Sequence, residues 1–568
     1  MGKIKKKLKY FFLLIIFFIL LIVYPLFFHK KETNNNILPE EYIKGVFHVH
    51  SNFSDGKGDI NEITRAAQRQ KLDFVILTDH GEPNLKCAGS TSFMNNVLLI
   101  GGSEFSLDCG HLACAGFNIE DYRFPNEPQE AINDVNSYNG FSFISHPLDN
   151  KIPWTDWDVN SFTGLEVLSS YSSARRIGVT GLFSFIIRYM INKEFALINT
   201  LHYPEDNLKI WDSFNKKGKY SGIYALDAHA QIPVTKKINL NFPSYESMFG
   251  ILNVYVKIEN PLENNPHISS KIIIQNIKKG NFFNVIEGIA SANGFDNYYV
   301  TSSGEKLDMG SSSENVNGHI IFELPFEFPV DIIIKKDGKN IYKVKNYFKN
   351  KFEFKVNKSG TYRSEIFLSK GRFRKLPWII TNPFFLNDSA ETKIEKKSGL
   401  KEISIFDNKK AFNIEMNPAS AGTIEYNITD NKSPFFLMKY HLKKEENKKN
   451  FWVSLSNRET RDLSDYKGIS FQASSAKRMR YWVEFRTLSD KKEKWYRHSF
   501  LADKNWRKIN IPFNKFSLIH GPEDGSNPDL SRIRAIFFSV NNSVSNLNEI
   551  RGELSLKAIS VFSYFHEK

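Results

Sequence analysis

Two short stretches in the first half of the chain carry side chains that could bind metal ions. The first holds His48 and His50 directly after a short apolar run, with Asp55 a few residues later. The second is the pair Asp79 and His80, at the end of another apolar run. Side chains two residues apart on a strand point to the same face, so His48 and His50 could hold one ion together. Imidazoles and carboxylates gathered where strands end predict a metal site.

The elements that must position these residues alternate between strand and helix from about residue 41. The apolar run at 74–77 and the stretch 141–147 predict strands, and 128–138 predicts a helix. Three further predicted strands or runs end on a residue of ligand type, namely Glu104, His146 and His229. Repeated β–α units with such residues at the strand ends predict a barrel with parallel strands.

Six motifs in this order make residues 44–290 resemble the PHP (polymerase and histidinol phosphatase) superfamily of metal-dependent phosphoesterases. They are HxH…SDG, TDH, a strand-end glutamate, Gly-His, His-Pro and Asp-Ala-His. The resemblance implies a distorted (β/α)7 barrel that holds up to three metal ions. The ligands that it implies are His48, His50, Asp55, His80, Glu104, His111, His146, Asp227 and His229.

The chemistry implied is hydrolysis of phosphate mono- or diesters with two or three divalent ions (Mn, Zn or Fe). Clustered ions would neutralise phosphate oxygens, and a hydroxide held by the metal ligands would attack phosphorus. The substrate would be a phosphorylated small molecule or an oligonucleotide. Two alternatives stay open: a nuclease for short oligonucleotides, and a non-enzymatic glycan-binding protein of the cell envelope on a PHP scaffold.

Other residues near the motifs have predicted supporting roles. Asp79, beside His80, is expected to orient a ligand imidazole. Lys57, Arg175 and Arg176 could bind a phosphate, with solvated surface as the alternative for each. Asp55 and His111 could support a ligand instead of being one.

The chain has 3 cysteines, Cys87, Cys109 and Cys114, so at least one stays unpaired. The sequence does not choose a disulfide pair. Thiolate ligation of a metal is an alternative, but the spacing of the three matches no zinc-knuckle pattern.

Residues 10–28 form an uncharged run of 19 residues after a basic tail with 5 lysines at 1–9. As a helix the run reaches about 28 Å, close to the bilayer core of about 30 Å. A cleaved signal peptide is the alternative, but no small-x-small site follows the run. The lysines predict a single-pass signal anchor with a cytoplasmic N-terminus, a linker at 29–43 and an extracytoplasmic catalytic domain. The apolar stretch 182–191 is short and contains Arg188, which predicts a buried helix.

The rest of the chain is all-β in pattern. Residues 291–386 alternate as short strands, similar to the small β-sandwich that follows the barrel in many exported PHP proteins. A polar linker at 387–402 leads to 403–568, which resembles a galactose-binding-like jelly roll. This part is similar to the complex I intermediate-associated protein family and some carbohydrate-binding modules, which implies a glycan partner. Trp495 or Tyr496 could stack on sugars, with packing as the alternative.

The formal net charge of +14 could indicate an anionic partner. Beyond the N-terminal tail, however, no single basic block stands out. The charge therefore does not favour a dedicated nucleic-acid surface.

Overall fold

The computed structural model of the protein describes thirteen segments and five single positions before them. The single positions are Tyr10, Leu13, Leu14, Phe17 and Lys31. The segments are 41–117, 122–176, 179–235, 238–240, 242–325, 328–387, 399–404, 409–428, 434–443, 451–489, 492–521, 528–545 and 549–565. The chain splits into two compact units: unit 1 is Met1–Ile119 with Asn126–Thr392, and unit 2 is Glu120–Pro125 with Lys393–Lys568.

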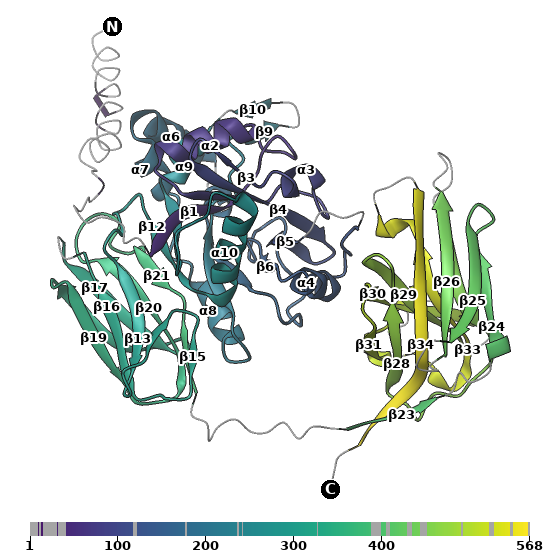
Figure 1. Ribbon diagram of the computed structural model, residues 1–568. Coiled ribbons are helices and arrows are strands. Elements are labelled where there is room, and N and C mark those ends of the chain that lie inside the picture. The colour runs from purple at the N-terminus through teal and green to yellow at the C-terminus, as the bar shows by residue number, and fades with distance from the viewer. Residues whose placement is uncertain are drawn as a thin grey trace. The chain divides into compact units, whose positions relative to one another are not determined.

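Unit 1 is built on a curled mixed sheet, a half-barrel (Figure 1), in the order β12-β11-β1-β2-β4-β5-β6-β7-β8. Its strands are β1 (Tyr42–Val49), β2 (Phe74–Leu77), β4 (Val97–Leu107), β5 (Gly110–Ala115), β6 (Phe141–Ile144), β7 (Gly164–Ser169), β8 (Ser221–Ala225), β11 (Leu252–Lys257) and β12 (Phe282–Ile286). The short strand β3 (Ser92–Met94) pairs with β4, and β9 (Ile232–Thr235) pairs with β10 (Ile238–Leu240).

The half-barrel is not parallel throughout, which corrects the expectation from the sequence. Strands β1, β2 and β4 are parallel, as are β6, β7 and β8, but β5 runs antiparallel to both of its neighbours. The physical reason is the connection, because only Asp108 and Cys109 separate β4 from β5. A parallel crossover needs a dozen or more residues, whereas two residues suffice for a hairpin. Strands β11 and β12 are also antiparallel to their neighbours.

The segment after β8 bonds to the end of β1, beside the strand ends that carry the motifs. The amide of Leu226 donates to Phe47 O at 3.1 Å, and the amide of Ala228 donates to His48 O at 3.1 Å. The amide of His50 donates back to Ala228 O at 3.0 Å. The segment after β8 is therefore fixed against the end of β1, which brings the first and last motifs of the region together.

Helices cover the outside of the half-barrel (Figure 1). They are α2 (Ile60–Arg69), α3 (Leu85–Ala88), α4 (Pro128–Ser137), α5 (Ser170–Arg175), α6 (Val179–Ile191), α7 (Lys193–Ile198), α8 (Glu205–Phe214), α9 (Tyr245–Phe249) and α10 (Pro266–Lys279). Helix α2 begins at the cap that the sequence predicts, since the Asp59 carboxylate accepts from the amide of Glu62 at 2.8 Å. The sequence predicted a buried helix at 182–191, but in α6 the side chains of Phe183, Met190 and Ile191 are exposed.

The small sandwich of unit 1 shares a sheet with the half-barrel. One of its sheets holds β13 (Asp296–Thr301), β14 (Lys306–Asp308), β16 (Gly318–Glu323) and β19 (Lys351–Val356). The other holds β15 (Ser312–Ser313), β17 (Val330–Lys336), β18 (Lys339–Tyr347), β20 (Gly360–Leu368), β21 (Ile379–Thr381) and β22 (Phe384–Leu386). Because β21 pairs with β12, the second sheet continues the curled sheet without a break.

Unit 2 is a β-sandwich of two antiparallel sheets. One sheet holds β23 (Gly399–Ser404), β25 (Ala421–Ile428), β26 (Pro434–Lys443), β28 (Gly468–Ser474), β31 (Arg507–Pro512) and β34 (Glu549–Phe565). The other holds β24 (Phe412–Met416), β27 (Trp452–Asn457), β29 (Met479–Ser489), β30 (Lys492–Ala502), β32 (Ser517–His520) and β33 (Ile533–Asn541). Tyr496 packs in the core of this sandwich, so it is not available to a sugar. Trp495 is only partly buried, and the guanidinium of Arg486 lies 3.9 Å from its ring centre.

Most of the predicted anchor at 10–28 lies outside the described residues. Its four described members, Tyr10, Leu13, Leu14 and Phe17, are helical and exposed. Within the described part of the chain, no helix has the length and apolar character needed to cross a bilayer. The 3 cysteines are all buried and none forms a disulfide.

Candidate metal centre

The structure brings the nine predicted ligand residues together at one end of the half-barrel. His48 lies in β1, Glu104 in β4 and His111 in β5. The others lie just after strands: His50 and Asp55 after β1, His80 after β2, His146 after β6, and Asp227 and His229 after β8. A parallel bridge joins His80 to Glu104, which fixes the end of β2 against β4. Residues from six strands or strand ends therefore share one small volume.

Unusual backbone conformations turn several of these side chains inward. The pairing of β1 with β2 shifts register between Val46 and Val49, and His48 within that shift has a φ of 65°. His146 has a φ of 30° and Asp227 a φ of 52°. Residues other than glycine rarely adopt a positive φ, and those that do cluster at functional sites. A local irregularity, and not strand alternation alone, thus directs His48 toward His50.

Four ligand atoms form a first group, called group A here. The Nε2 atoms of His48 and His50 lie 3.1 Å apart, and each lies 3.3 Å from Glu104 Oε2. Asp227 Oδ1 lies 3.6 Å from the nitrogen of His48 and 3.4 Å from that of His50. Ligands held at 2.0–2.2 Å around a tetrahedral ion are about 3.4 Å from one another. The nitrogens of His48 and His50 and the oxygen of Glu104 therefore have the spacing of ligands to a single ion, with the Asp227 carboxylate beside the two imidazoles.

The other oxygen of Glu104 faces a second group, called group B. Glu104 Oε1 lies 3.2 Å from His111 Nδ1 and 3.2 Å from His146 Nε2. Glu104 is 1% exposed, and its two oxygens thus serve two neighbouring groups. A carboxylate in this position can bridge two ions.

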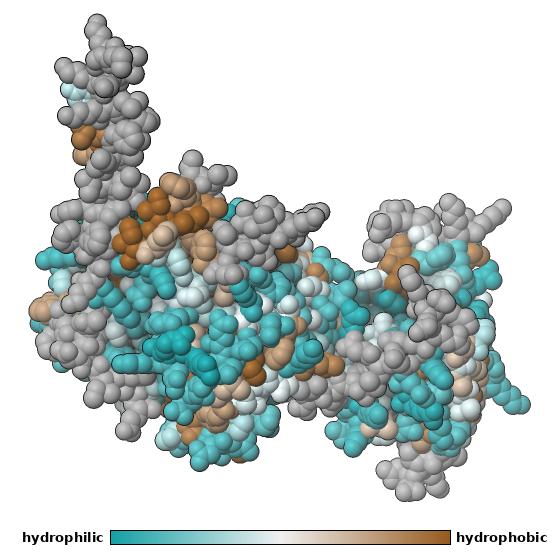
Figure 2. Space-filling model, turned by 90° about the horizontal axis from the view of Figure 1, so that it is seen from above, coloured by the Kyte–Doolittle hydropathy of each residue, from teal (hydrophilic) through white to brown (hydrophobic). Residues whose placement is uncertain are grey.

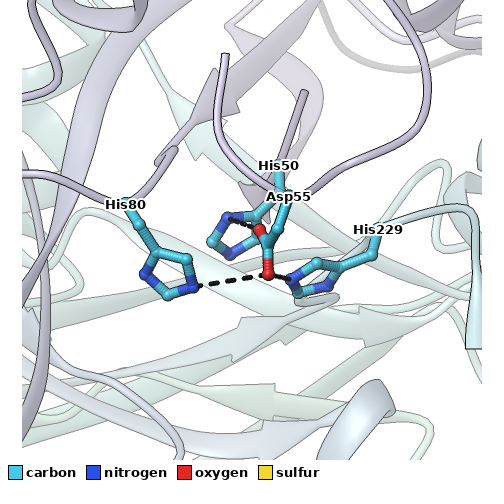
Figure 3. Close-up of side chains that lie close together, drawn as sticks. All are labelled: His50, Asp55, His80 and His229. Atoms are coloured by element: carbon cyan, nitrogen blue, oxygen red, sulfur yellow. Dashed lines mark ion pairs between the residues drawn. The ribbon is translucent and has the colours of Figure 1, made fainter. Parts of the chain in front are cut away.

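Asp55 is at the centre of a third group, called group C (Figure 3). Its Oδ2 lies 3.3 Å from His229 Nε2 and 3.8 Å from His80 Nε2, and its Oδ1 lies 3.4 Å from His50 Nδ1. The rings of His50 and His229 stack with centroids 4.1 Å apart. The side chain of Asp55 is 53% exposed, so group C is the part of the cluster that opens to solvent.

Three buried ring nitrogens of the cluster make no hydrogen bond among the described residues. They are His80 Nδ1, His111 Nδ1 and His146 Nδ1, all inaccessible to solvent. The nitrogens of His80 and His111 each lie within 3.3 Å of a Glu104 oxygen, in a geometry that does not make a hydrogen bond. A buried polar atom without a partner is costly, and a metal ion would satisfy both nitrogens and the carboxylate at once. The residues present therefore fit a cluster of divalent ions.

The carboxylates and imidazoles shift each other's protonation. Burial alone would lower the pKa of His48 and His50, but Glu104 and Asp227 outweigh it. The pKa of His48 is raised well above its usual range, and that of His50 is raised to about 9. The same contacts hold the pKa of Glu104 and Asp227 far below the usual range in spite of burial. Protons on imidazoles are thus the only positive charge that this cluster has of its own.

Glu166 is a site residue that the sequence pattern did not single out. It lies in β7, is fully buried, and its Oε1 lies 2.5 Å from His48 Nδ1. Its Oε2 accepts a hydrogen bond of 2.7 Å from the amide of His146. One carboxylate thereby orients a ring of group A and the backbone that carries a member of group B. The available signal was a single charge in the otherwise uncharged run Gly-Leu-Glu-Val-Leu-Ser.

Asp79 holds a loop, and its hydrogen bonds do not go to an imidazole. Its Oδ1 accepts from the Ser51 amide at 2.9 Å and from Ser54 Oγ at 2.7 Å. Its Oδ2 accepts from Ser51 Oγ at 2.8 Å. Glu166, and not Asp79, is therefore the carboxylate bonded to the ring of a predicted ligand, while Asp79 fixes the turn that carries Asp55.

The predicted phosphate-binding residues lie at different distances from the groups. Lys57 is exposed, although its amide donates to His229 O at 2.9 Å. The guanidinium of Arg175 lies 4.4 Å from the ring centre of Tyr171, and that ring stacks on His229 at 5.0 Å. Arg176 borders a cleft of about 240 Å³ that His146 also lines. Arg175 and Arg176 are therefore on the rim of the cluster.

Comparisons with known proteins agree with this division of the chain. Residues 421–557 match the family model of complex I intermediate-associated protein 30 (CIA30), which confirms the likeness expected for the last third. No match to the chain was found among curated proteins.

Solved structures resemble both parts. A two-domain protein from Bacteroides vulgatus ATCC 8482, described as containing a predicted PHP-like metal-dependent phosphoesterase, is 14% identical. The match covers 63% of this chain and 99% of that one, with a TM-score of 0.30. A family 11 carbohydrate-binding module from Clostridium thermocellum is 18% identical, covers 29% of this chain and 94% of its own, and has a TM-score of 0.23. Both scores lie well below 0.5, so neither likeness supports an inference about activity.

Proposed function

We propose that this chain is a metal-dependent phosphoesterase of the PHP type, anchored in a membrane with its catalytic half-barrel outside the cytoplasm. The chemistry is supported by the position of Glu104, since one of its oxygens lies beside the imidazoles of group A and the other beside those of group B. When bound, two or three divalent ions (Mn, Zn or Fe) would neutralise phosphate oxygens and make water nucleophilic.

The side chains of the cluster have distinct parts in this proposal. Group A and group B are buried and would hold ions rigidly, since Glu166 fixes the tautomer of His48 through its Nδ1. Group C, with the half-exposed Asp55, is where a substrate would enter. Arg175, stacked on Tyr171 beside His229, has the position and charge to bind a phosphate at the rim.

A panel of phosphate esters tests the proposal. The purified full chain, loaded in turn with Mn, Zn and Fe, is offered phosphomonoesters, phosphodiesters and short oligonucleotides. Turnover of small esters supports the proposal, and turnover of oligonucleotides alone identifies the nuclease alternative. A folded, metal-loaded chain that turns over none of them contradicts the enzyme and favours the binding protein.

The location proposed rests on the lysine asymmetry around residues 10–28. Protease added to intact spheroplasts is expected to remove the region from residue 44 onward and to leave a short membrane-bound stub. Protection of that region would reverse the topology. A mature chain that begins shortly after residue 28, found by mass spectrometry, would replace the anchor by a cleaved signal.

Glycan binding by unit 2 is proposed as a second role. The supporting observation is Trp495, a partly buried indole on β30 with Arg486 over its ring. Binding of the full chain to a glycan array, lost in Trp495→Ala and kept in Trp157→Ala of unit 1, is the expected result. Equal binding by both variants would remove Trp495 from any such site.

A further inference from the structure

Helix α6 is mostly apolar in sequence, and one of its faces is open to solvent. Phe185 and Tyr189 are buried and pack against Phe242, with ring centroids 6.3 and 5.6 Å from it. Phe183 and Met190 lie seven residues apart on the opposite face and are 69% and 81% exposed. Figure 2 shows hydrophobic surface gathered over this part of the molecule. A concentrated apolar face of this kind marks an interaction site.

A basic segment lies beside this face. The connection from β20 to β21 holds four exposed cations, Lys370, Arg372, Arg374 and Lys375. It is fixed to α7, the helix that follows α6, because the rings of Phe373 and Phe195 lie 5.6 Å apart. Burial lowers the pKa of Arg188 in α6, and the positive charge of Arg372 adds to this effect, which places Arg372 near α6. The apolar face thus has a cationic border.

The N-terminal run leads to the same place. Lys31 Nζ lies 3.1 Å from Glu287 Oε1, so the chain is attached to unit 1 at residue 31. Burial raises the pKa of Glu194 on α7 and the charge of Lys31 opposes that rise, so Lys31 is close to α7 as well. The apolar run ends at Phe28, and three residues reach at most about 10 Å. A membrane helix ending there would bring the bilayer surface to α7 and its neighbour α6.

We propose that α6 lies in the interface of an anionic lipid bilayer. Phe183, Met190 and Ile191 enter the boundary between headgroups and acyl chains, and the basic segment 370–375 contacts lipid phosphates. An apolar helix face with adjacent lysine and arginine is the chemistry that such a surface binds. The inference rests on the proposed anchor and adds a second contact that orients unit 1 on the membrane.

A fluorophore at position 190 tests this contact. The full chain carrying Met190→Cys is labelled with an environment-sensitive dye in nanodiscs that hold one chain each. Ile268→Cys on α10 is the matched control, because Ile268 is also an exposed, large apolar side chain, at 41%. The native thiols of Cys87, Cys109 and Cys114 are buried, which raises their pKa, so the introduced thiol reacts first. Emission at 190 is expected to shift to the blue and to be quenched by brominated lipid, while emission at 268 does not change.

Lipid charge and the basic segment sharpen the test. The blue shift at 190 is expected to be larger with phosphatidylglycerol than with phosphatidylcholine alone, and Arg372→Glu with Arg374→Glu removes that difference. Water-like emission at 190 in intact nanodiscs overturns the proposal. A blue shift that needs no lipid and grows with protein concentration identifies a second copy of the chain as the partner, which also overturns it.

Failure of the anchor is distinguishable from failure of this contact. Alkaline extraction of membranes is expected to leave the full chain in the pellet, both for the wild type and for Phe183→Ser with Met190→Ser. Release of the wild type contradicts the anchor, and the dye at position 190 with added phosphatidylglycerol vesicles then decides whether α6 binds lipid.

Discussion

In the described part of unit 1, a cluster of buried charged side chains around Arg363 can be compared with the one around Glu104. In the first, the guanidinium of Arg363 donates to both oxygens of Asp212 at 2.7 and 2.8 Å and to Glu365 at 2.7 Å. Lys335 lies 3.2 Å from Glu365, and Tyr203 donates to it at 2.8 Å. Each carboxylate here has a permanent cation supplied by the chain.

The cluster around Glu104 has carboxylates of similar burial but no such cation among its members. The ion pairs of Glu104, Asp227 and Glu166 among the described residues are with imidazoles, and those rings are positive only when they are protonated. Three buried ring nitrogens, on His80, His111 and His146, make no hydrogen bond among the described residues. Burial of charge therefore does not by itself identify a binding site. What identifies it is a set of ligand atoms that the chain leaves short of positive charge.

Replacing a predicted ligand of group A should lower the rate of phosphoester hydrolysis more than any other change considered. Asp227→Asn and His48→Gln each remove an atom from group A, so kcat for phosphoester hydrolysis should fall by about a thousandfold or more. Steady-state kinetics at saturating metal provide the measurement. The exposed His267 on α10 gives the control, since His267→Gln should keep wild-type rates. Wild-type turnover in both ligand variants would remove the proposed site.

Breaking the other cluster should cost stability and leave the chemistry intact. Arg363→Met leaves Asp212 and Glu365 without their main cation, which should lower the free energy of unfolding by about 3–5 kcal/mol. The exposed pair of Arg69 and Glu246 is the control, because Arg69→Met should cost less than about 1 kcal/mol. Denaturant unfolding measures both, and equal losses would show that the buried cluster is not special. The amount of metal bound per folded chain should be the same in Arg363→Met as in the wild type.

Removing the support of a ligand should weaken metal binding without abolishing it. Glu166→Gln keeps the size of the side chain but loses the charge beside His48 Nδ1, so metal affinity should fall by about 10- to 100-fold. Excess metal should restore most of kcat, which a merely structural defect would not allow. Unchanged affinity in calorimetric titrations would contradict the role assigned to Glu166.

The smallest expected effect is on the pH dependence of stability in the chelated protein. The pKa of His50 and of His146 is raised to about 9 by the neighbouring carboxylates, although burial opposes the shift. In the unfolded chain a histidine has a pKa of about 6.5. A raised pKa stabilises the fold below the unfolded value, and this contribution is lost as the pH rises from about 6.5 to about 9.

The melting temperature of the chelated chain should therefore fall by several degrees across that range. The metal-loaded chain should not show this decline, because its imidazoles carry ions and not protons. Differential scanning fluorimetry with and without chelator compares the two. Identical profiles would mean that no ion replaces the protons.

The sequence predicted the members of the cluster better than it predicted the fold around them. Ligand-type residues at strand ends stand out against apolar runs, and all nine predicted ligands converge in the structure. Their role as metal ligands stays a prediction. Glu166 was missed because the sequence does not distinguish a carboxylate that supports a site from any other single polar residue in a strand. Its meaning depends on His48, which is 118 residues away in the sequence.

The differences in fold have equally local causes. The hairpin between β4 and β5 reverses one strand of the half-barrel, and the periodicity of a short buried strand does not show its direction. Helix α6 was expected to be buried because hydrophobicity indicates where apolar side chains avoid water. It does not indicate whether protein or lipid covers them.

Metal analysis of the purified full chain tests whether the cluster around Glu104 holds divalent ions. The chain, dialysed free of loose metal, should contain two or three equivalents of transition metal. Chelation should remove these together with phosphoester hydrolysis, and added Mn or Zn should restore both. Asp227→Asn should bind at least one ion fewer, whereas His267→Gln should match the wild type. A folded chain that binds no metal at saturation, or that hydrolyses phosphate esters equally well without it, would contradict the account.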